Sequence, residues 1–352
     1  MGHRVLRTVG ALAVAVACAA PAAVIAGQQS KPAPAKPASQ NGEAADLLKK
    51  ARAEAAAGKT YKTPRTAWGE PDLEGVWSYA TTTPLSRPDS VPPDKKQLTE
   101  DEIEAIAERQ AAQQDAAPRA GDPGTYNNFW WDRGASIGRT SLIVDPPDGK
   151  LPPLTPEGQK RRAARIAQER DHPADSYLDR SPTDRCIMYH GVPPLSSGYN
   201  NTYQIFQSPG LVAILDENIH HVRMIPLDGR PHIPDAVRQW NGDSRGRWEG
   251  DVLVVETRNF NEKTRLRYGG SENTVSVERF KRVGPDVIDY QYTITDPLSY
   301  TRPFTVALPL PRRDDKVFEY ACHEGNHALA GILSGARVEE RQAKEPATTR
   351  QR

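Results

Sequence analysis

The sequence has almost no net charge, and this shortage restricts the partners that the protein can have. Forty-six lysines and arginines stand against 45 acids, which leaves a formal charge of +1 over 352 residues. No basic stripe or cationic helix is visible, so no nucleic-acid partner is expected. Beyond the N-terminal segment, no apolar run reaches the roughly 20 residues that a spanning helix needs, so no membrane span is expected.

Recognisable cofactor motifs are also missing from the chain. Neither a P-loop nor a Gly-x-Gly-x-x-Gly dinucleotide fingerprint is present, and these are the usual signs of nucleotide-phosphate binding. We therefore expect a small-molecule ligand or substrate as the partner, with no cofactor and no metal.

Cysteine is scarce, with three residues at positions 18, 186 and 322. An odd number leaves one thiol unpaired, but Cys18 lies in an N-terminal segment that resembles an export signal. Cys186 and Cys322 then form a candidate disulfide in an oxidising compartment. The alternative is that both are buried free thiols, which is a common state of cysteine.

The first 26 residues have the pattern of a secretory signal peptide. A short basic segment precedes an apolar run at 9–17, and small residues ending at Ala26 suit signal cleavage. The run is short for a membrane anchor, which is the alternative. A weak lipobox at 15–18 would instead make Cys18 the site of a lipid anchor. Whether the chain is cleaved after Ala26 or before Cys18, we expect a periplasmic or secreted protein.

The rest of the chain divides into a linker, one domain and a tail. Residues 27–60 are rich in proline and alanine and predict a linker, whereas residues 61–338 predict a single β-rich domain. Residues 339–352 form a polar tail. Helices are expected near 98–116 and 155–169, because each segment begins with an N-cap signal.

Local signals place the helix starts and two aromatic anchors. Thr99 and Glu102 have the spacing of a capping box, and Pro156 suits the first position of a helix. Trp68 and Trp77 stand in a turn-rich entry to the domain, where we expect both rings to pack on its surface.

Short β-branched segments recur between Gly, Pro and Asp turns from residue 141 onward. This spacing predicts an antiparallel barrel or sandwich, and we favour a lipocalin-like barrel with two or three peripheral helices. In one segment Ser276, Glu278 and Phe280 alternate with valines and arginine, which suits a barrel with a polar lumen. The expected strands are 141–144, 203–206, 211–215, 221–226, 252–257 with Trp248 opposite, 274–282, 287–295, 304–309 and 317–322.

One segment matches the zinc-protease motif His-Glu-x-x-His. It contains His323, Glu324 and His327, and in such proteases two histidines on one helical face hold the metal. However, the preceding 317–322 segment reads as a strand, Gly and Asn are poor helix formers, and no third ligand is evident. We therefore expect no zinc site, and an alternative is a strand-to-helix turn held by Glu324 and Asn326.

The densest group of functional side chains lies at the ends of two expected strands. His220 or His221 suits general acid–base chemistry near neutral pH, while Arg223 and Arg230 suit a carboxylate or phosphate. His221 and Arg223 alternate along a strand, so both would face one side, and we expect that side to be the lumen. His232 is a further ligand-binding candidate. The alternative is a surface hairpin with solvated charges.

Two further segments add candidates to this list. Asn200, Asn201 and Tyr203 could hydrogen-bond a hydroxylated ligand, although a polar turn is the alternative. A segment at 240–251 more readily forms a structural turn around Asp243 and Arg245, with Trp248 in the core. If Cys186 pairs with Cys322, then Asp184 and Arg185 would lie beside His323 and Glu324, where an acid, a base and an arginine could share one pocket. Tyr320, His323 and Glu324 are further catalytic candidates.

Four motifs together resemble a large family of exported bacterial proteins. They are TPRTAWGEPDLEGVW at 63–77, IPLDGRPH at 225–232, GDSRGRWEGD at 242–251 and FEYACHEGN at 318–326. The resemblance covers about residues 63–338 and implies export, but no particular activity. Family members commonly have Tyr after this last motif, where the present chain has His327, and this departure further weakens the zinc reading.

These observations favour a periplasmic or secreted enzyme that acts on a small polar or anionic compound, with carbohydrate derivatives among the candidates. In this hypothesis a histidine supplies acid–base chemistry in a metal-independent lyase or hydrolase. The alternative is a lipocalin-like binding protein without catalysis.

Overall fold

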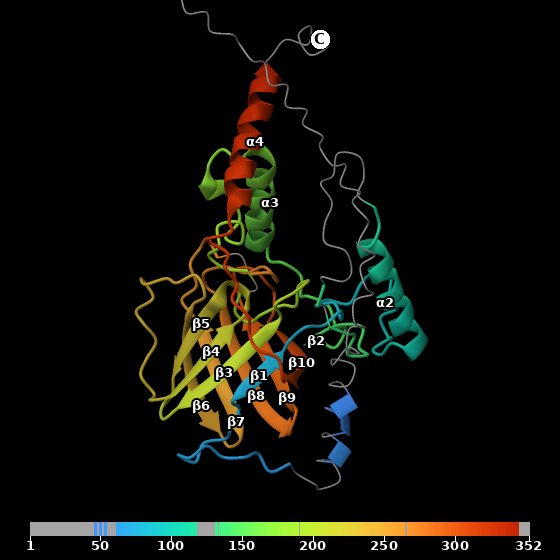
Figure 1. Cartoon of the computed structure of the whole chain (residues 1–352), viewed down its shortest axis with the longest axis vertical. Helices are drawn as coiled ribbons and strands as arrows, with labels where there is room; N and C mark the ends of the chain where they lie inside the picture. Colours follow the sequence, from blue (N-terminus) through green and yellow to red (C-terminus); the bar gives the residue numbers. More distant parts are fainter. Residues whose placement is uncertain are drawn as a thin grey trace, which may run out of the picture. The chain divides into compact units, whose positions relative to one another are not determined.

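The computed structural model describes residues 61–344 except 118–130, 133, 190 and 265, together with six residues between 46 and 54. Within this part the chain forms a mainly β structure with α-helices α2 (Glu100–Gln114), α3 (Pro156–Asp171) and α4 (His327–Lys344) (Figure 1). The strands are β1 (Gly75–Ser78), β2 (Ile143–Asp145), β3 (Thr202–Ser208), β4 (Leu211–Asp216), β5 (His221–Pro226), β6 (Asp243–Glu249), β7 (Val252–Arg258), β8 (Val275–Gly284), β9 (Val287–Thr295) and β10 (Phe304–Arg313).

Nine of these strands form a nearly closed antiparallel barrel, as the sequence predicts. Their order is β5-β4-β3-β1-β10-β9-β8-β7-β6, and the short β2 also pairs with β10. The end strands β5 and β6 do not pair through their backbones, but they approach each other at Gly246. A Cβ atom there would lie 2.5 Å from Leu227 Cδ2 and 2.8 Å from Ile225 Cγ2, so only glycine permits this approach.

The interior of the barrel is filled with aromatic rings around a small polar centre. On β8, the side chains of Ser276, Glu278 and Phe280 are buried while those of Arg279 and Lys281 are exposed. The polar face of this strand therefore points inward, as a polar lumen requires. Large rings surround the polar groups, and the fully buried ones include Trp77, Tyr79, Tyr203, Tyr290, Tyr292, Phe260, Phe280 and Phe304.

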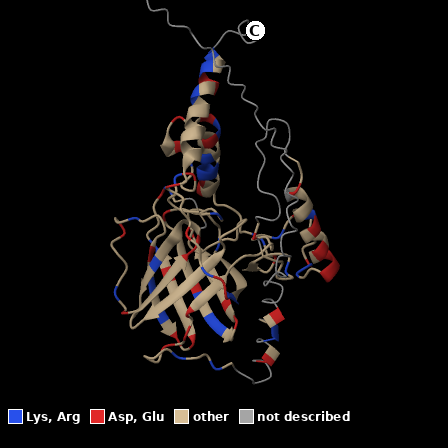
Figure 2. Ribbon diagram, in the orientation of Figure 1, with Lys and Arg blue, Asp and Glu red and all other residues tan. Residues whose placement is uncertain are grey.

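Helices α2, α3 and α4 each begin at a side-chain cap. Thr99 and Glu102 form the predicted capping box of α2, whose acidic first turn is red in Figure 2. Thr155 caps α3, with Pro156 in the first turn as expected. At α4, Asn326 Oδ1 accepts the Leu329 backbone N–H at 3.2 Å and so caps the helix. The alternative to a zinc site also expected Asn326 to hold the turn before a helix.

One prediction for the C-terminal region, the strand at 317–322, is wrong. Residues 317–322 follow the end of β10 at Arg313 and form no strand. They pair with none of the described strands, and Phe318 is 69% exposed. The first residues of the segment expected as a polar tail, from 339 to Lys344, belong to helix α4, which contains no buried residue. Residues 345–352 lie outside the described part.

Two corrections concern the strands near the barrel seam and the entry. The segment around Asp243 and Arg245 is strand β6 rather than a turn, and it pairs with β7 along its whole length. Strand β1 was not expected, because it lies in a segment that reads as turns. It nevertheless completes the barrel between β3 and β10.

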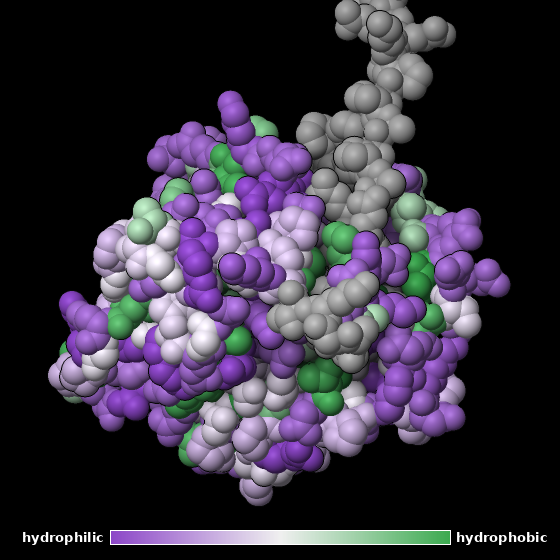
Figure 3. Space-filling model, turned by 90° about the horizontal axis from the view of Figure 1, so that it is seen from below, coloured by the Kyte–Doolittle hydropathy of each residue, from purple (hydrophilic) through white to green (hydrophobic). Residues whose placement is uncertain are grey.

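Of the two tryptophans in the entry segment, only one is an anchor. Trp77 on β1 is fully buried, and its indole N–H donates to the Leu73 carbonyl at 2.9 Å. Trp68 is 38% exposed and its indole bonds to Glu70 instead, so its expected packing is wrong. Figure 3 shows hydrophobic residues as separate patches on a mainly hydrophilic face, a normal surface pattern.

The N-terminal predictions lie outside the described residues. They are the signal peptide at 1–26, the alternative lipid site at Cys18 and most of the linker at 27–60. Within the described part, none of the helices has the length and apolar character needed to span a bilayer.

Candidate anion-binding pocket

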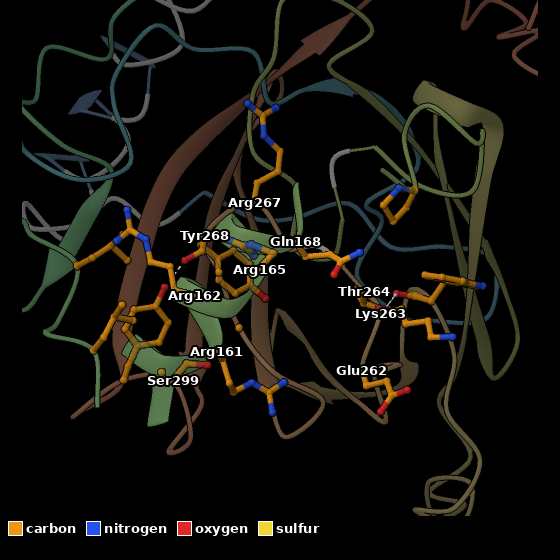
Figure 4. A pocket seen from close by; sticks show the side chains of 18 of the residues that line it. Arg161, Arg162, Arg165, Gln168, Glu262, Lys263, Thr264, Arg267, Tyr268 and Ser299 are labelled. Atoms are coloured by element: carbon orange, nitrogen blue, oxygen red, sulfur yellow. Dashed lines mark hydrogen bonds between the residues drawn. The ribbon is translucent and has the colours of Figure 1, made fainter. Parts of the chain in front are cut away.

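A pocket of about 820 Å³ lies between α3 and the loop that joins β7 to β8 (Figure 4). This volume is within the range of roughly 300–1,000 Å³ that is typical of small-molecule sites. Arg161, Arg162 and Arg165 come from α3, whereas Glu262, Lys263 and Thr264 lie across the pocket from them. The lining has seven cationic side chains, namely Arg161, Arg162, Lys263, Arg165, Arg180, Arg185 and Arg267.

The helical repeat explains why α3 presents several cations to one cavity. Arg161 and Arg165 are four residues apart and therefore share a helix face, with Arg162 beside them. The first turn is held tightly, because a Cβ atom at Gly158 would lie 2.5 Å from the Ser299 carbonyl oxygen. Thr155 also donates its hydroxyl to the Leu298 carbonyl. These contacts fix the direction of α3 against the barrel.

Acidic side chains neutralise only part of this positive charge. Arg161 forms a two-point ion pair with Glu272, with N–O distances of 2.7 and 3.3 Å. Arg180 Nη2 lies 2.9 Å from an Asp184 carboxylate oxygen, and Arg165 is 4.0 Å from Glu169. The acids in the lining itself are Asp179 and Glu262.

Four cations in the lining have no acidic partner among the described residues. They are Arg162, Arg185, Lys263 and Arg267. Arg185 packs on the Tyr177 ring at 5.5 Å, and Arg267 Nη1 donates to the Leu195 carbonyl at 3.4 Å. A concave surface with uncompensated charge of one sign concentrates its field and attracts ions of the opposite sign.

The floor of this pocket is made of neutral tyrosines. Tyr300 donates its hydroxyl to the Tyr268 carbonyl, and Tyr268 donates to the Val192 carbonyl at 3.4 Å. Burial and then Asp296 raise the pKa of Tyr300 to about 12, against an opposing effect of Arg162 and Arg165. The floor therefore adds no negative charge near neutral pH, so the cations of the rim determine the sign of the site.

A second cavity of about 740 Å³ opens where β5 and β6 diverge, and we call it the seam groove. Its lining includes His221, Arg223, Arg230, Trp240 and Arg245. His221 and Arg223 face one side of β5, as predicted, while Val222 and Met224 are exposed on the other. Burial and then Arg223 lower the pKa of His221 to about 4, so this imidazole is neutral near pH 7.

The other residues expected beside His221 have structural partners. His220 Nδ1 lies 3.0 Å from the Tyr320 carbonyl oxygen. Arg230 is exposed and paired with Asp228 two residues away. His232 sits between two carboxylates, with 2.7 Å from Nδ1 to Asp243 and 3.3 Å from Nε2 to Glu256.

The residues of the amide cluster form hydrogen bonds within the protein. Asn201 is buried, and its side chain bonds to the backbone of Ser197 and Asp132 at 2.7–3.1 Å. Asn200 accepts the Tyr79 hydroxyl on its carbonyl at 3.4 Å. The Tyr203 ring is buried, with the Arg223 guanidinium 5.9 Å from its centre.

Cys186 and Cys322 form the predicted disulfide, with 5.7 Å between their Cα atoms. The disulfide brings the segment around Asp184 next to the segment around Asn326, as expected. Asn326 Nδ2 donates to the Asp184 carbonyl at 2.9 Å. His323 and Glu324, however, are exposed in a turn that precedes α4. Neither residue is part of the lining of the anion-binding pocket, which includes Arg185.

The zinc-protease motif does not form a metal site within the described residues. His323 lies in a turn and His327 is the first residue of α4, so the two are not on one helix face. No cluster of three or more metal-binding side chains occurs in this part of the chain.

A serine-hydrolase pattern, Gly-Ala-Ser-Ile-Gly at 134–138, also lacks the structure that its chemistry needs. No helix follows it, whereas a nucleophile elbow joins a strand to a helix. The Ser136 hydroxyl is buried, accepts the Gly138 N–H at 3.1 Å and lies 3.4 Å from the Thr83 hydroxyl.

The sequence-based prediction missed most of the anion-binding pocket. Of its seven cations, only Arg185 was a candidate. The signal was the run Lys-Arg-Arg-Ala-Ala-Arg at 160–165 on a predicted helix, which places several cations close together. Comparison with protein-family models, with curated proteins and with solved structures finds no match to this chain.

Proposed function

We propose that this protein binds a small polyanionic compound in the pocket beside α3. The observation that carries the proposal is the set of four cations without acidic partners in one cavity of about 820 Å³. Arginine forks fit carboxylate and phosphate groups, and such charge-assisted bonds are stronger than neutral ones. The tyrosines at the floor are neutral near pH 7 and add no opposing charge to that of Asp179 and Glu262.

Binding is better supported than acid–base catalysis at His221. With a pKa of about 4, its imidazole is a weak base, since an efficient base has a pKa near the working pH. No described residue forms a hydrogen bond that would orient the ring, although catalytic bases usually have such a partner. Arg223 beside it is already paired with Glu278.

We also propose that the protein functions outside the cytoplasm after export. The Cys186–Cys322 disulfide supports this, because disulfides persist mainly in oxidising compartments. The N-terminal signal pattern supports the same location.

Calorimetric titration with citrate tests the binding proposal. We expect the full chain to bind citrate more weakly as salt rises, because salt screens exposed charges. The double substitution R162Q/R267Q should weaken binding by about tenfold or more, since each charge-assisted bond is worth about 1.5–3 kcal/mol. Neither substitution leaves an acid unpaired, so the fold should be retained.

The matched control is Arg247→Gln, which removes an exposed arginine on β6 that pairs with Glu249 outside the pocket lining. It should leave citrate affinity within about twofold of the original. An absence of citrate binding at low salt, or equal losses in R162Q/R267Q and R247Q, would contradict the proposal.

A further inference from the structure

Trp240 belongs to the lining of both large cavities. It borders the anion-binding pocket together with Arg185, and it borders the seam groove together with Ile187, two residues further along the chain. The two cavities therefore adjoin at Trp240, and a ligand that extends past this residue has access to both.

The segment around Trp240 is held in place by its backbone. The Trp240 carbonyl accepts the Thr264 hydroxyl at 2.9 Å. Gln239 donates its N–H to the Asn259 carbonyl and accepts the Asn261 N–H, at 2.9 and 2.8 Å. The indole itself is half-buried and makes no hydrogen bond within the described residues. It is thus an aromatic surface on a segment whose backbone is held, and its N–H is available as a donor.

Positive charge continues from the pocket into the seam groove. Arg238 lines the groove without an acidic partner among the described residues, and it donates to the backbone carbonyl of Glu272 at 2.8 Å. The Glu272 carboxylate pairs with Arg161 in the other cavity. Arg245 adds a cation that Asp243 compensates, and Asp243 is the only acid in the groove lining.

We propose that the polyanion of the proposed function is a linear acidic oligosaccharide that runs from the arginine pocket across Trp240 into the seam groove. This inference rests on the proposed function and specifies its ligand. Carboxylates of successive sugar units would meet cations on both sides. Amide side chains of Gln168, Gln239 and Asn241 suit sugar hydroxyls, and the indole suits the apolar face of a sugar ring.

The aromatic content of the cavities favours a sugar over single-stranded nucleic acid. Sites for single strands stack successive bases on several exposed rings. Here Tyr268 and Tyr300 are buried in the pocket floor with their hydroxyls bonded. Trp240 is the aromatic side chain that remains accessible in the two linings.

The test is calorimetric titration of the full chain with galacturonate and its linear oligomers of two to six units. Affinity should rise by at least about tenfold between the monomer and the hexamer, because the longer chain reaches the groove. Trp240→Ala should remove this gain and leave monomer affinity within about twofold. Arg238→Gln, on the exposed surface, should reduce hexamer affinity several-fold without affecting the monomer. Trp68→Ala is the matched tryptophan control and should change neither.

The remaining outcomes separate this inference from the proposed function. Suppose that citrate binds but the hexamer binds no tighter than the monomer. The oligosaccharide inference is then overturned and the anion pocket stands. The same conclusion follows if the hexamer still binds more tightly than the monomer in both W240A and R238Q. The inference also fails if single-stranded DNA or tripolyphosphate gives the same gain with the same dependence on Trp240. If citrate, monomer and hexamer all fail to bind, the proposed function fails with it.

Discussion

The guanidinium of Arg223 and the carboxylate of Glu278 form a two-point ion pair inside the barrel, with N–O distances of 2.5 and 3.1 Å. The pair joins β5 to β8, which are not neighbours in the sheet. Arg223 is 5% exposed and Glu278 is 0% exposed, and the Tyr290 hydroxyl donates to Glu278 at 2.6 Å. Both charges are therefore satisfied within the protein.

Removing one member of this pair should be strongly destabilising. Glu278→Gln leaves the Arg223 charge buried without its counter-ion, which typically costs about 3–5 kcal/mol. Urea unfolding at pH 7 measures the loss. The double substitution R223M/E278L should cost less than either single change, because it leaves no buried charge. A loss below about 1 kcal/mol in E278Q would contradict this assignment.

Asp216 should make the fold less stable as the pH rises from about 4 to about 7. Burial raises the pKa of this carboxyl to about 7, against the opposing hydrogen bond from Tyr79 at 2.8 Å. The folded pKa lies above the unfolded value of about 3.9, so folding favours the protonated form and stability is lost on ionisation. Asp216→Asn should therefore stabilise the protein at pH 8, by up to about 4 kcal/mol, and much less at pH 4.

Urea unfolding of D216N and the original chain at pH 4 and pH 8 gives this comparison. His221 acts in the opposite sense, because its lowered pKa of about 4 reduces stability as the pH falls below about 6.5. His221 is present in both proteins, so its effect cancels in the difference. Equal effects of D216N at the two pH values would show that Asp216 is not the titrating group.

The Cys186–Cys322 disulfide should contribute substantially to stability. It closes a loop with a sequence separation of 136 residues, for which the chain-entropy model gives about 5 kcal/mol. Thermal unfolding with and without a reductant should show a clear fall in the midpoint on reduction. The C186S/C322S variant should unfold near the reduced midpoint and should not respond to the reductant. If the reductant also lowers the midpoint of that variant, the disulfide is not the cause.

The strand pattern was predictable because local alternation and turn residues dictate it. Residues 221–226 alternate buried and exposed side chains, and the predicted strand has the same bounds as β5. Strand β1 escaped prediction since its partners, β3 and β10, are distant in sequence. The 317–322 segment has β-forming residues but pairs with none of the described strands, so its propensity does not produce a strand.

The candidate site was less predictable because long-range contacts decide the role of each side chain. Arg223 looked available for a ligand, but Glu278, 55 residues away, pairs with it. The alternation of Ser276, Glu278 and Phe280 indicated the polar interior without indicating this partner. Arg162 and Lys263 lie about 100 residues apart in sequence, and only the packing of α3 against the β7–β8 loop brings them to one cavity.

A crystal structure of the full chain with citrate tests the central claim most directly, because it locates the anion. The proposed binding site predicts density between α3 and the β7–β8 loop, with carboxylate oxygens within hydrogen-bond distance of Arg162, Lys263 or Arg267. Citrate bound only elsewhere, or an empty pocket at a concentration that saturates binding in solution, would contradict it.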